Sequence, residues 1–234
     1  MTSTGPTRWQ QLTGGTGGED YAARFAALAA GGQDMHGEAT FVANLVGPDA
    51  RVLDAGCGTG RVAIRLSELG YHCVGVDVDE SMLAIARREQ PDVPWLSGDV
   101  AALRSDVTER APYDVVVLAG NVVPLLEPGT LETTMTGLAD VLAPGGLLVA
   151  GFGLDLRHLP GGCPVTPLAD YVTAAAAAGL TAVARFSTWQ GAPYHENEGY
   201  VVDVHRCAES LHQQHARRHV GAHICRTGRL EPCR

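Results

Sequence analysis

The chain repeatedly alternates short apolar runs with helical stretches, and few folds accommodate that order. Apolar runs that predict strands cover residues 51–55, 73–77, 94–97, 113–119 and 147–152. Helical spacing of apolar residues separates most of them, for example over 61–69, 79–88 and from Thr130 to Leu142. Strands alternating with helices predict a parallel sheet that is covered by helices.

The last part of the chain departs from this alternation. A helix is expected from Thr166-Pro167 to Gly179, followed by strands over 181–188 and 200–205 with no helix between them. Two strands without a crossover helix predict an antiparallel hairpin. The expected fold is therefore α/β: a doubly wound, mostly parallel seven-stranded sheet with a terminal antiparallel hairpin and helices on both faces.

We expect one main domain over residues 19–209, because the apolar content of 45% can fill one core. Its first part, 19–46, is expected to form helices that precede the first strand. Residues 1–18 are rich in Gly, Thr and Gln and predict a flexible arm. Residues 210–234 lack apolar periodicity and predict a disordered or appended tail. Histidines and a cysteine in this tail offer metal ligands, but no zinc spacing is recognisable and no metal is expected: His212, His215, His219, His223, Cys225.

Charge and hydropathy limit the kinds of partner and location that we expect for the chain. The net charge is −9 and the chain contains no lysine, so nucleic acid is not an expected partner. No apolar stretch is long enough to span a membrane and no export signal precedes the domain, which favours a cytoplasmic location with reduced cysteines. The sequence leaves the oligomeric state open.

A glycine-rich turn follows the first strand, and acids follow the next two. Gly56, Gly58 and Gly60 lie where a buried strand must turn into a helix, and glycines there let the backbone approach a ligand closely. Asp77, at the tip of the second strand, can accept hydrogen bonds from both hydroxyls of a ribose, while Asp79 is placed to cap the following helix. Asp99, after the third strand, can accept the amino group of an adenine.

Five stretches together resemble the class I S-adenosylmethionine-dependent methyltransferases. They are Leu53-Asp54-Ala55-Gly56-Cys57-Gly58-Thr59-Gly60, Gly75-Val76-Asp77, Gly98-Asp99-Val100, Tyr113-Asp114-Val115-Val116 and Leu142-Ala143-Pro144-Gly145-Gly146, in the family's order over residues 35 to 206. The resemblance implies S-adenosylmethionine as cofactor, with Gly56 and Gly58 near its methionine part and Val78 and Met82 beside the adenine. It also implies that the helices of residues 19–46 lie over the cofactor site. The expected cofactor-binding residues are Tyr21, Arg24, Asp54, Gly56, Cys57, Gly58, Asp77, Val78, Met82, Gly98, Asp99, Val100, Ala119 and Asn121.

The glycine spacing argues against a dinucleotide cofactor. A dinucleotide-binding loop has its third glycine three residues after the second, whereas here the glycines alternate. Asp54 would also repel a pyrophosphate, but it suits a cofactor that carries an ammonium and a sulfonium.

The expected partner is a small-molecule acceptor, because only a short loop, 154–165, follows the fifth strand. The catalytic residues stay open. His36, Asn121 and His195 are candidate catalytic residues, with Glu38 and Glu196 beside the two histidines, although each also fits an ordinary helix-start or loop role. A non-catalytic cofactor-binding module is one alternative, and a nucleic-acid methyltransferase, favoured only by the basic tail, is another.

Overall fold

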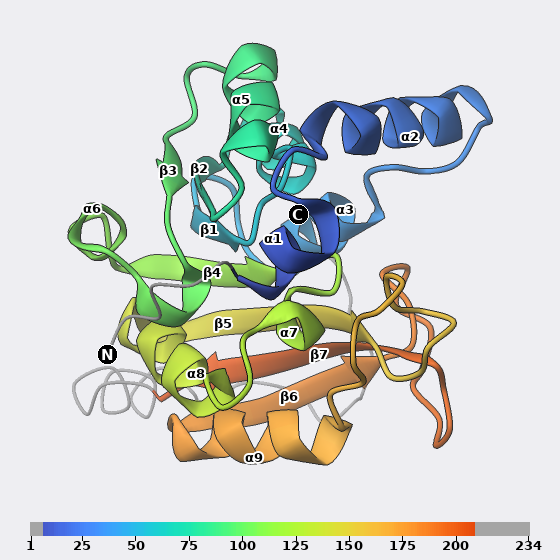
Figure 1. The fold of residues 1–234 in the computed structure, drawn as a ribbon. Helices are drawn as coiled ribbons and strands as arrows, with labels where there is room; N and C mark the ends of the chain where they lie inside the picture. Colours follow the sequence, from blue (N-terminus) through green and yellow to red (C-terminus); the bar gives the residue numbers. More distant parts are fainter. Residues whose placement is uncertain (1–6, 209–234) are drawn as a thin grey trace.

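The computed structural model describes residues 7–208, which form a seven-stranded sheet between two layers of helices (Figure 1). The strands are β1 (Arg51–Ala55), β2 (His72–Asp77), β3 (Trp95–Ser97), β4 (Tyr113–Leu118), β5 (Leu142–Gly153), β6 (Leu180–Phe186) and β7 (Tyr200–Cys207). Their order across the sheet is β3-β2-β1-β4-β5-β7-β6. β7 pairs antiparallel with both β5 and β6, and the other pairs are parallel, which confirms the predicted sheet and its terminal hairpin.

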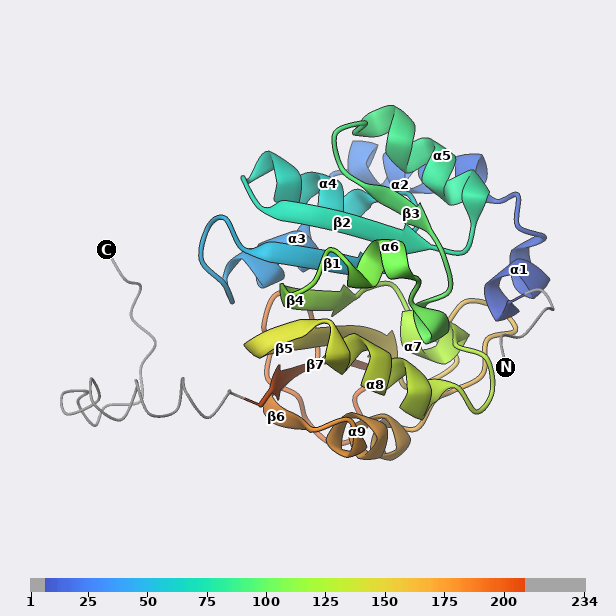
Figure 2. The same ribbon diagram turned by 90° about the vertical axis from the view of Figure 1, so that its left-hand side faces the viewer.

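Alternate residues of the central strands pack into two separate cores. Val115 and Val117 of β4 face one core, whereas Val116 and Leu118 face the other, as the two-residue period of a strand requires. The first core is covered by α3 (Gly37–Ala43), α4 (Arg61–Glu68) and α5 (Glu80–Glu89). The second is covered by α6 (Ser105–Thr108), α8 (Leu131–Asp140), α9 (Leu168–Ala177) and the 3-10 turn η1 (Val100–Ala102). In Figure 2, α6 and α8 lie in front of the sheet and α3 lies behind it.

Several boundaries differ from those predicted. Pro144-Gly145-Gly146, expected as a turn, lies inside β5, where the pairing with β4 shifts register between Tyr113 and Val115. Three short elements, η1, α6 and α7 (Val122–Leu125), were not predicted, because they are too short to show an apolar period.

The main correction concerns the flexible arm that was predicted over residues 1–18, of which the structure describes residues 7–18. Residues Arg8–Thr13 form helix α1, and Gly18–Ala30 form α2, which begins three residues before the predicted helix at Tyr21. Thr7 and Gln10 make a capping box at the start of α1: the Gln10 amide donates to the Thr7 hydroxyl, and the Gln10 side chain accepts from the Thr7 amide. The predicted tail, 210–234, and its histidines lie outside the described residues. No helix among residues 7–208 is both long and apolar enough to cross a membrane.

Candidate functional site

A cleft that is partly open to solvent lies at the carboxyl ends of β1, β2, β3 and β4. Parallel strands carry their ligand sites at this edge, because the turns into the following helices diverge there. The cleft is lined by Thr7, Trp9, Tyr21, Asp54, Gly56, Cys57, Gly58, Thr59, Arg61, Val62, Asp77, Val78, Met82, Asp99, Val100, Ala119, Gly120, Val122, Leu125, Leu126 and Glu127.

Asp77 joins the glycine loop to the end of β2. Its Oδ2 accepts the Gly58 amide at 2.7 Å, and its Oδ1 accepts the Asp79 amide at 2.9 Å. Each carboxylate oxygen can accept more than one hydrogen bond, so both remain able to bind hydroxyl groups in the cleft. Burial raises the pKa of Asp77 above its ordinary value, although the two backbone amides oppose that shift.

The glycine loop leaves the floor of the cleft open. Gly58 has a φ of +54°, and a Cβ built there would meet nothing within 4 Å. Gly56 has a φ of +78°, and a Cβ there would come within 2.5 Å of a Val122 methyl group. At Gly56, glycine is required because a side chain would clash with Val122. At Gly58, glycine is required by the left-handed backbone conformation, and the open space beside it can hold a ligand.

Asp54 lies beneath this loop, almost completely buried, and its Oδ2 accepts the Ala63 amide at 3.2 Å. Burial raises its pKa to about 7, because only one backbone amide and the more distant Arg61 oppose the cost of burying its charge. A cationic group in the cleft would favour the ionised form of this acid.

Arg61 forms part of one wall and is held by Glu38. Two hydrogen bonds join the guanidinium to the Glu38 carboxylate, at 2.5 and 2.8 Å, and a third joins it to the Met35 carbonyl. The guanidinium also lies 5.0 Å from the centre of the Phe25 ring, which packs against Tyr21. Glu38, in the first turn of α3, thus orients an arginine that lines the cleft.

Helix α1 crosses the mouth of the cleft. The Trp9 indole donates to Asp79 Oδ2 at 2.7 Å, and the Arg8 guanidinium donates to the Pro124 carbonyl of α7 at 2.7 Å. Figures 1 and 2 both show α1 beside α7. Because α1 contacts both the α5 side and the α7 side, it covers the cleft from solvent.

Most of the residues expected to bind a cofactor line the cleft. They are Tyr21, Asp54, Gly56, Cys57, Gly58, Asp77, Val78, Met82, Asp99, Val100 and Ala119. The structure does not bring Arg24, Gly98 or Asn121 to its lining. Arg24 is exposed on α2 and lies over Phe25, whereas the Gly98 amide donates to the Asp77 carbonyl.

The three candidate catalytic residues also lie outside the cleft lining. His36 is exposed at the start of α3, and His195 is exposed beside Glu196 in the β6–β7 loop. The Asn121 amide group is used within the fold, because it donates to the His158 carbonyl and accepts the Gly153 amide.

Sequence reasoning missed Thr7 and Trp9 of α1 and the apolar residues of α7. The Thr7–Gln10 spacing was a usable signal for α1, since a capping box has this spacing. Residues Val122, Leu125 and Leu126 follow β4 in a segment whose helix is a single turn, so no periodicity marked them.

Comparisons with known proteins agree with the fold. Residues 52–146 match a family model described as a methyltransferase domain. A TehB-like SAM-dependent methyltransferase from Corynebacterium glutamicum is 29% identical, with a TM-score of 0.72 over 82% of this chain and 98% of that one. The CcbJ methyltransferase from Streptomyces caelestis is 25% identical, with a TM-score of 0.65 over 75% of this chain and 90% of that one.

Among curated relatives, the glycine N-methyltransferase of Mus musculus is 32% identical over 113 residues, which cover 42% of this chain and 39% of the mouse protein. The match to the first curated relatives covers about 40% of their length.

Proposed function

Because the chain belongs to the class I S-adenosylmethionine-dependent methyltransferases, we propose that it transfers a methyl group from S-adenosylmethionine to a small-molecule acceptor. The observation that carries the proposal is the cleft at the strand ends, where Asp77, Asp99 and the open backbone at Gly58 face one space.

The residues of the cleft fit this cofactor. Asp77 would hold the ribose hydroxyls, and Asp99 would accept the adenine amino group through a carboxylate whose Oδ1 already accepts the Ala101 amide. Val78 and Met82 offer apolar surface for the adenine. The acids lining the cleft suit a ligand that carries an ammonium and a sulfonium, and they oppose a phosphate.

When bound, S-adenosylmethionine supplies an electrophilic methyl group on a sulfonium. The chain then has to align the acceptor with that methyl group and to exclude water. The Asp77–Gly58 bond fixes the glycine loop, the Glu38–Arg61 pair fixes the wall, and α1 covers the opening. These contacts position the reactants, and no covalent step on the protein is required.

Two features support a small acceptor. The β5–α9 connection is a short loop, 154–167, and α1 narrows the entrance to the cleft. A long polymer would have to reach past both. The net charge of −9 also opposes binding of a nucleic acid.

The purified chain tests this proposal with methyl-labelled S-adenosylmethionine. We expect label to enter compounds in a low-molecular-weight filtrate of a bacterial extract, and not the protein or RNA of the retained fraction. Label in RNA or protein alone would contradict the small-molecule assignment. Cofactor binding without any transfer would instead support a non-catalytic module.

The raised pKa of Asp54 predicts a pH-dependent stability of the cofactor-free protein. Its pKa is about 7 in the fold and near 3.8 in an unfolded chain, so the folded state binds more protons between these values. Stability should therefore fall as the pH rises from 4 to 7 by roughly 4 kcal/mol at most, from about three pKa units at 1.36 kcal/mol each. Urea unfolding at pH 5 and pH 8 measures the change.

Asp54→Asn is the matched variant, because its amide oxygen can still accept the Ala63 amide while no charge is buried. We expect it to be more stable than the natural chain at pH 8 and to lose most of the decline with pH. An unchanged decline in Asp54→Asn would assign the effect to other groups.

A further inference from the structure

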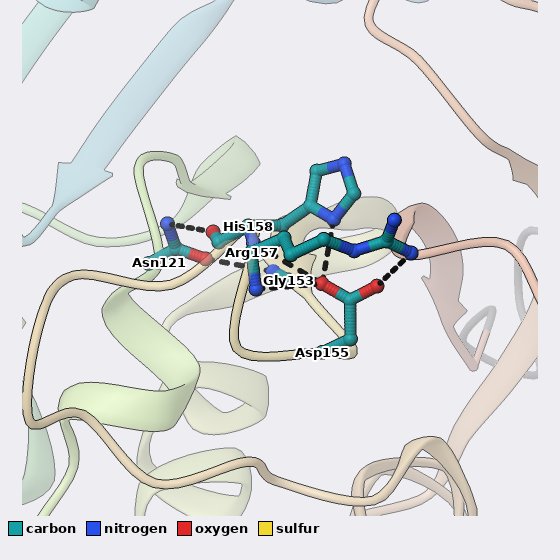
Figure 3. A network of polar contacts seen from close by, with 5 residues as sticks. All are labelled: Asn121, Gly153, Asp155, Arg157 and His158. Atoms are coloured by element: carbon teal, nitrogen blue, oxygen red, sulfur yellow. Dashed lines mark hydrogen bonds and ion pairs between the residues drawn. The ribbon is translucent and has the colours of Figure 1, made fainter.

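The loop after β5 carries a histidine–aspartate pair that the cofactor site does not use (Figure 3). His158 Nδ1 lies 2.8 Å from Asp155 Oδ1. The same oxygen accepts the backbone amides of Arg157 and His158, and Asp155 Oδ2 accepts the Arg157 guanidinium at 3.2 Å. The carboxylate is thereby held in one orientation against the imidazole.

The fold fixes the position of His158 from two further sides. Asn121, at the end of β4, donates to the His158 carbonyl at 3.1 Å and accepts the Gly153 amide at 2.7 Å, as Figure 3 shows. A Cβ at Gly199 would lie 2.4 Å from the Nδ1 and Cε1 atoms of His158. Glycine at this position leaves the space that the imidazole occupies.

His158 and Asp155 do not line the cleft themselves, but Asn121 joins their loop to its wall. Gly120, which precedes Asn121, lines the cleft, and the Asn121 side chain donates to the backbone carbonyl of His158. On the other side, the Tyr200 ring lies 6.4 Å from the His158 ring. The His158 side chain is 44% exposed, so an acceptor can reach its ring.

The charges around the imidazole determine its tautomer. The hydrogen bond from His158 lowers the pKa of Asp155 to about 2, so this carboxylate is ionised at neutral pH. An ionised carboxylate at Nδ1 holds the ring proton on that atom and leaves the Nε2 lone pair free. Among residues 7–208, the neighbouring titratable groups are Arg157 of the same loop, which binds Asp155, and Tyr200 of β7, whose ring lies beside the imidazole.

Resting on the methyl transfer proposed above, we propose that His158, oriented by Asp155, is the general base that accepts the proton of the acceptor atom. As the lone pair of that atom forms its bond to the methyl carbon, His158 Nε2 takes its proton. The carbon–sulfur bond breaks with its electron pair on sulfur, so the positive charge of the sulfonium ends on the imidazolium. The acceptor is therefore a hydroxyl compound or an amine that must lose a proton.

The tautomer can be measured without knowing the acceptor. In protein labelled with ¹⁵N-histidine, the resonances assigned to His158 by their loss in His158→Gln should show a neutral ring protonated at Nδ1. Asp155→Asn should shift the proton toward a mixture of tautomers. A neutral ring protonated at Nε2 in the natural chain would overturn the proposal, because that nitrogen could not accept a proton.

Turnover of the low-molecular-weight filtrate tests the same role by its pH profile. His158→Gln should lower turnover on the order of 100-fold or more and remove the decline in rate at acid pH, because a positioned base contributes about this much. S-adenosylmethionine binding, measured by calorimetry, should be unchanged. His72→Gln is the control, since His72 is exposed at the opposite end of β2.

The outcomes separate the two proposals. If the natural chain does not bind S-adenosylmethionine or transfer its methyl group, the proposed function fails. If it does both and His158→Gln keeps its rate and its pH profile, only the base assignment fails, and the pair then serves only to fix the loop.

Discussion

Asp77→Ala should weaken S-adenosylmethionine binding by ~100-fold or more, because hydrogen bonds to a charged group contribute roughly 1.5–3 kcal/mol each and two ribose hydroxyls lose their acceptor. The same change leaves the amides of Gly58 and Asp79 without their carboxylate partner, so the glycine loop also loses its tie to β2. Isothermal titration calorimetry measures the dissociation constant.

Two companion variants keep this result interpretable. Asp77→Asn retains an acceptor oxygen and the side-chain volume, and should weaken binding less than Asp77→Ala. Asp92→Ala removes an exposed acid between α5 and β3 and should leave binding unchanged. Unaltered binding in both Asp77 variants would mean that Asp77 does not hold the cofactor.

Gly58→Val should abolish detectable binding of S-adenosylmethionine. A Cβ at Gly58 meets no protein atom within 4 Å, and the residue lines the cleft, so a valine side chain would extend into the space for the ligand. Calorimetry again gives the affinity, while thermal unfolding shows whether the variant remains folded.

Gly70→Val is the matched control for backbone strain. Gly70 has a φ of +92° and, like Gly58, leaves open space at its Cβ position, but it lies in the turn after α4 and does not line the cleft. Both variants should lose about 1–2 kcal/mol of stability from the left-handed backbone conformation. Only Gly58→Val should lose binding of S-adenosylmethionine. Equal binding by both variants would show that the glycine loop does not contact the cofactor.

The sequence predicted the sheet well, because its central strands are buried on both faces. Val115 and Val117 pack into one core while Val116 and Leu118 pack into the other, so β4 is a continuous apolar run that is easy to recognise. The hairpin of β6 and β7 was predicted by the missing crossover helix. Helix α1 was not, because its six residues are polar apart from Trp9 and Leu12 and are held by distant partners, such as Asp79.

The residues of the candidate site also fall into those that the sequence could predict and those that it could not. Residues at strand ends, such as Asp77 and Asp99, could be predicted because the strand order brings these ends together. Residues on α1, α7 and the β5–α9 loop could not, since their positions depend on side-chain contacts between distant segments. Asn121 illustrates this: its type suggested a ligand contact, whereas its amide group fixes the backbone at Gly153 and His158.

The central claim is that the glycine loop and the acids after β2 and β3 converge on one adenosyl ligand. A crystal structure with S-adenosylhomocysteine tests it most directly, because this product of methyl transfer carries the same adenosine. We expect the ribose hydroxyls on the Asp77 carboxylate, the adenine amino group at Asp99 and the amino-acid part over Gly56 and Gly58. An adenosine bound elsewhere, or Asp77 and Asp99 without contact to it, would contradict the account.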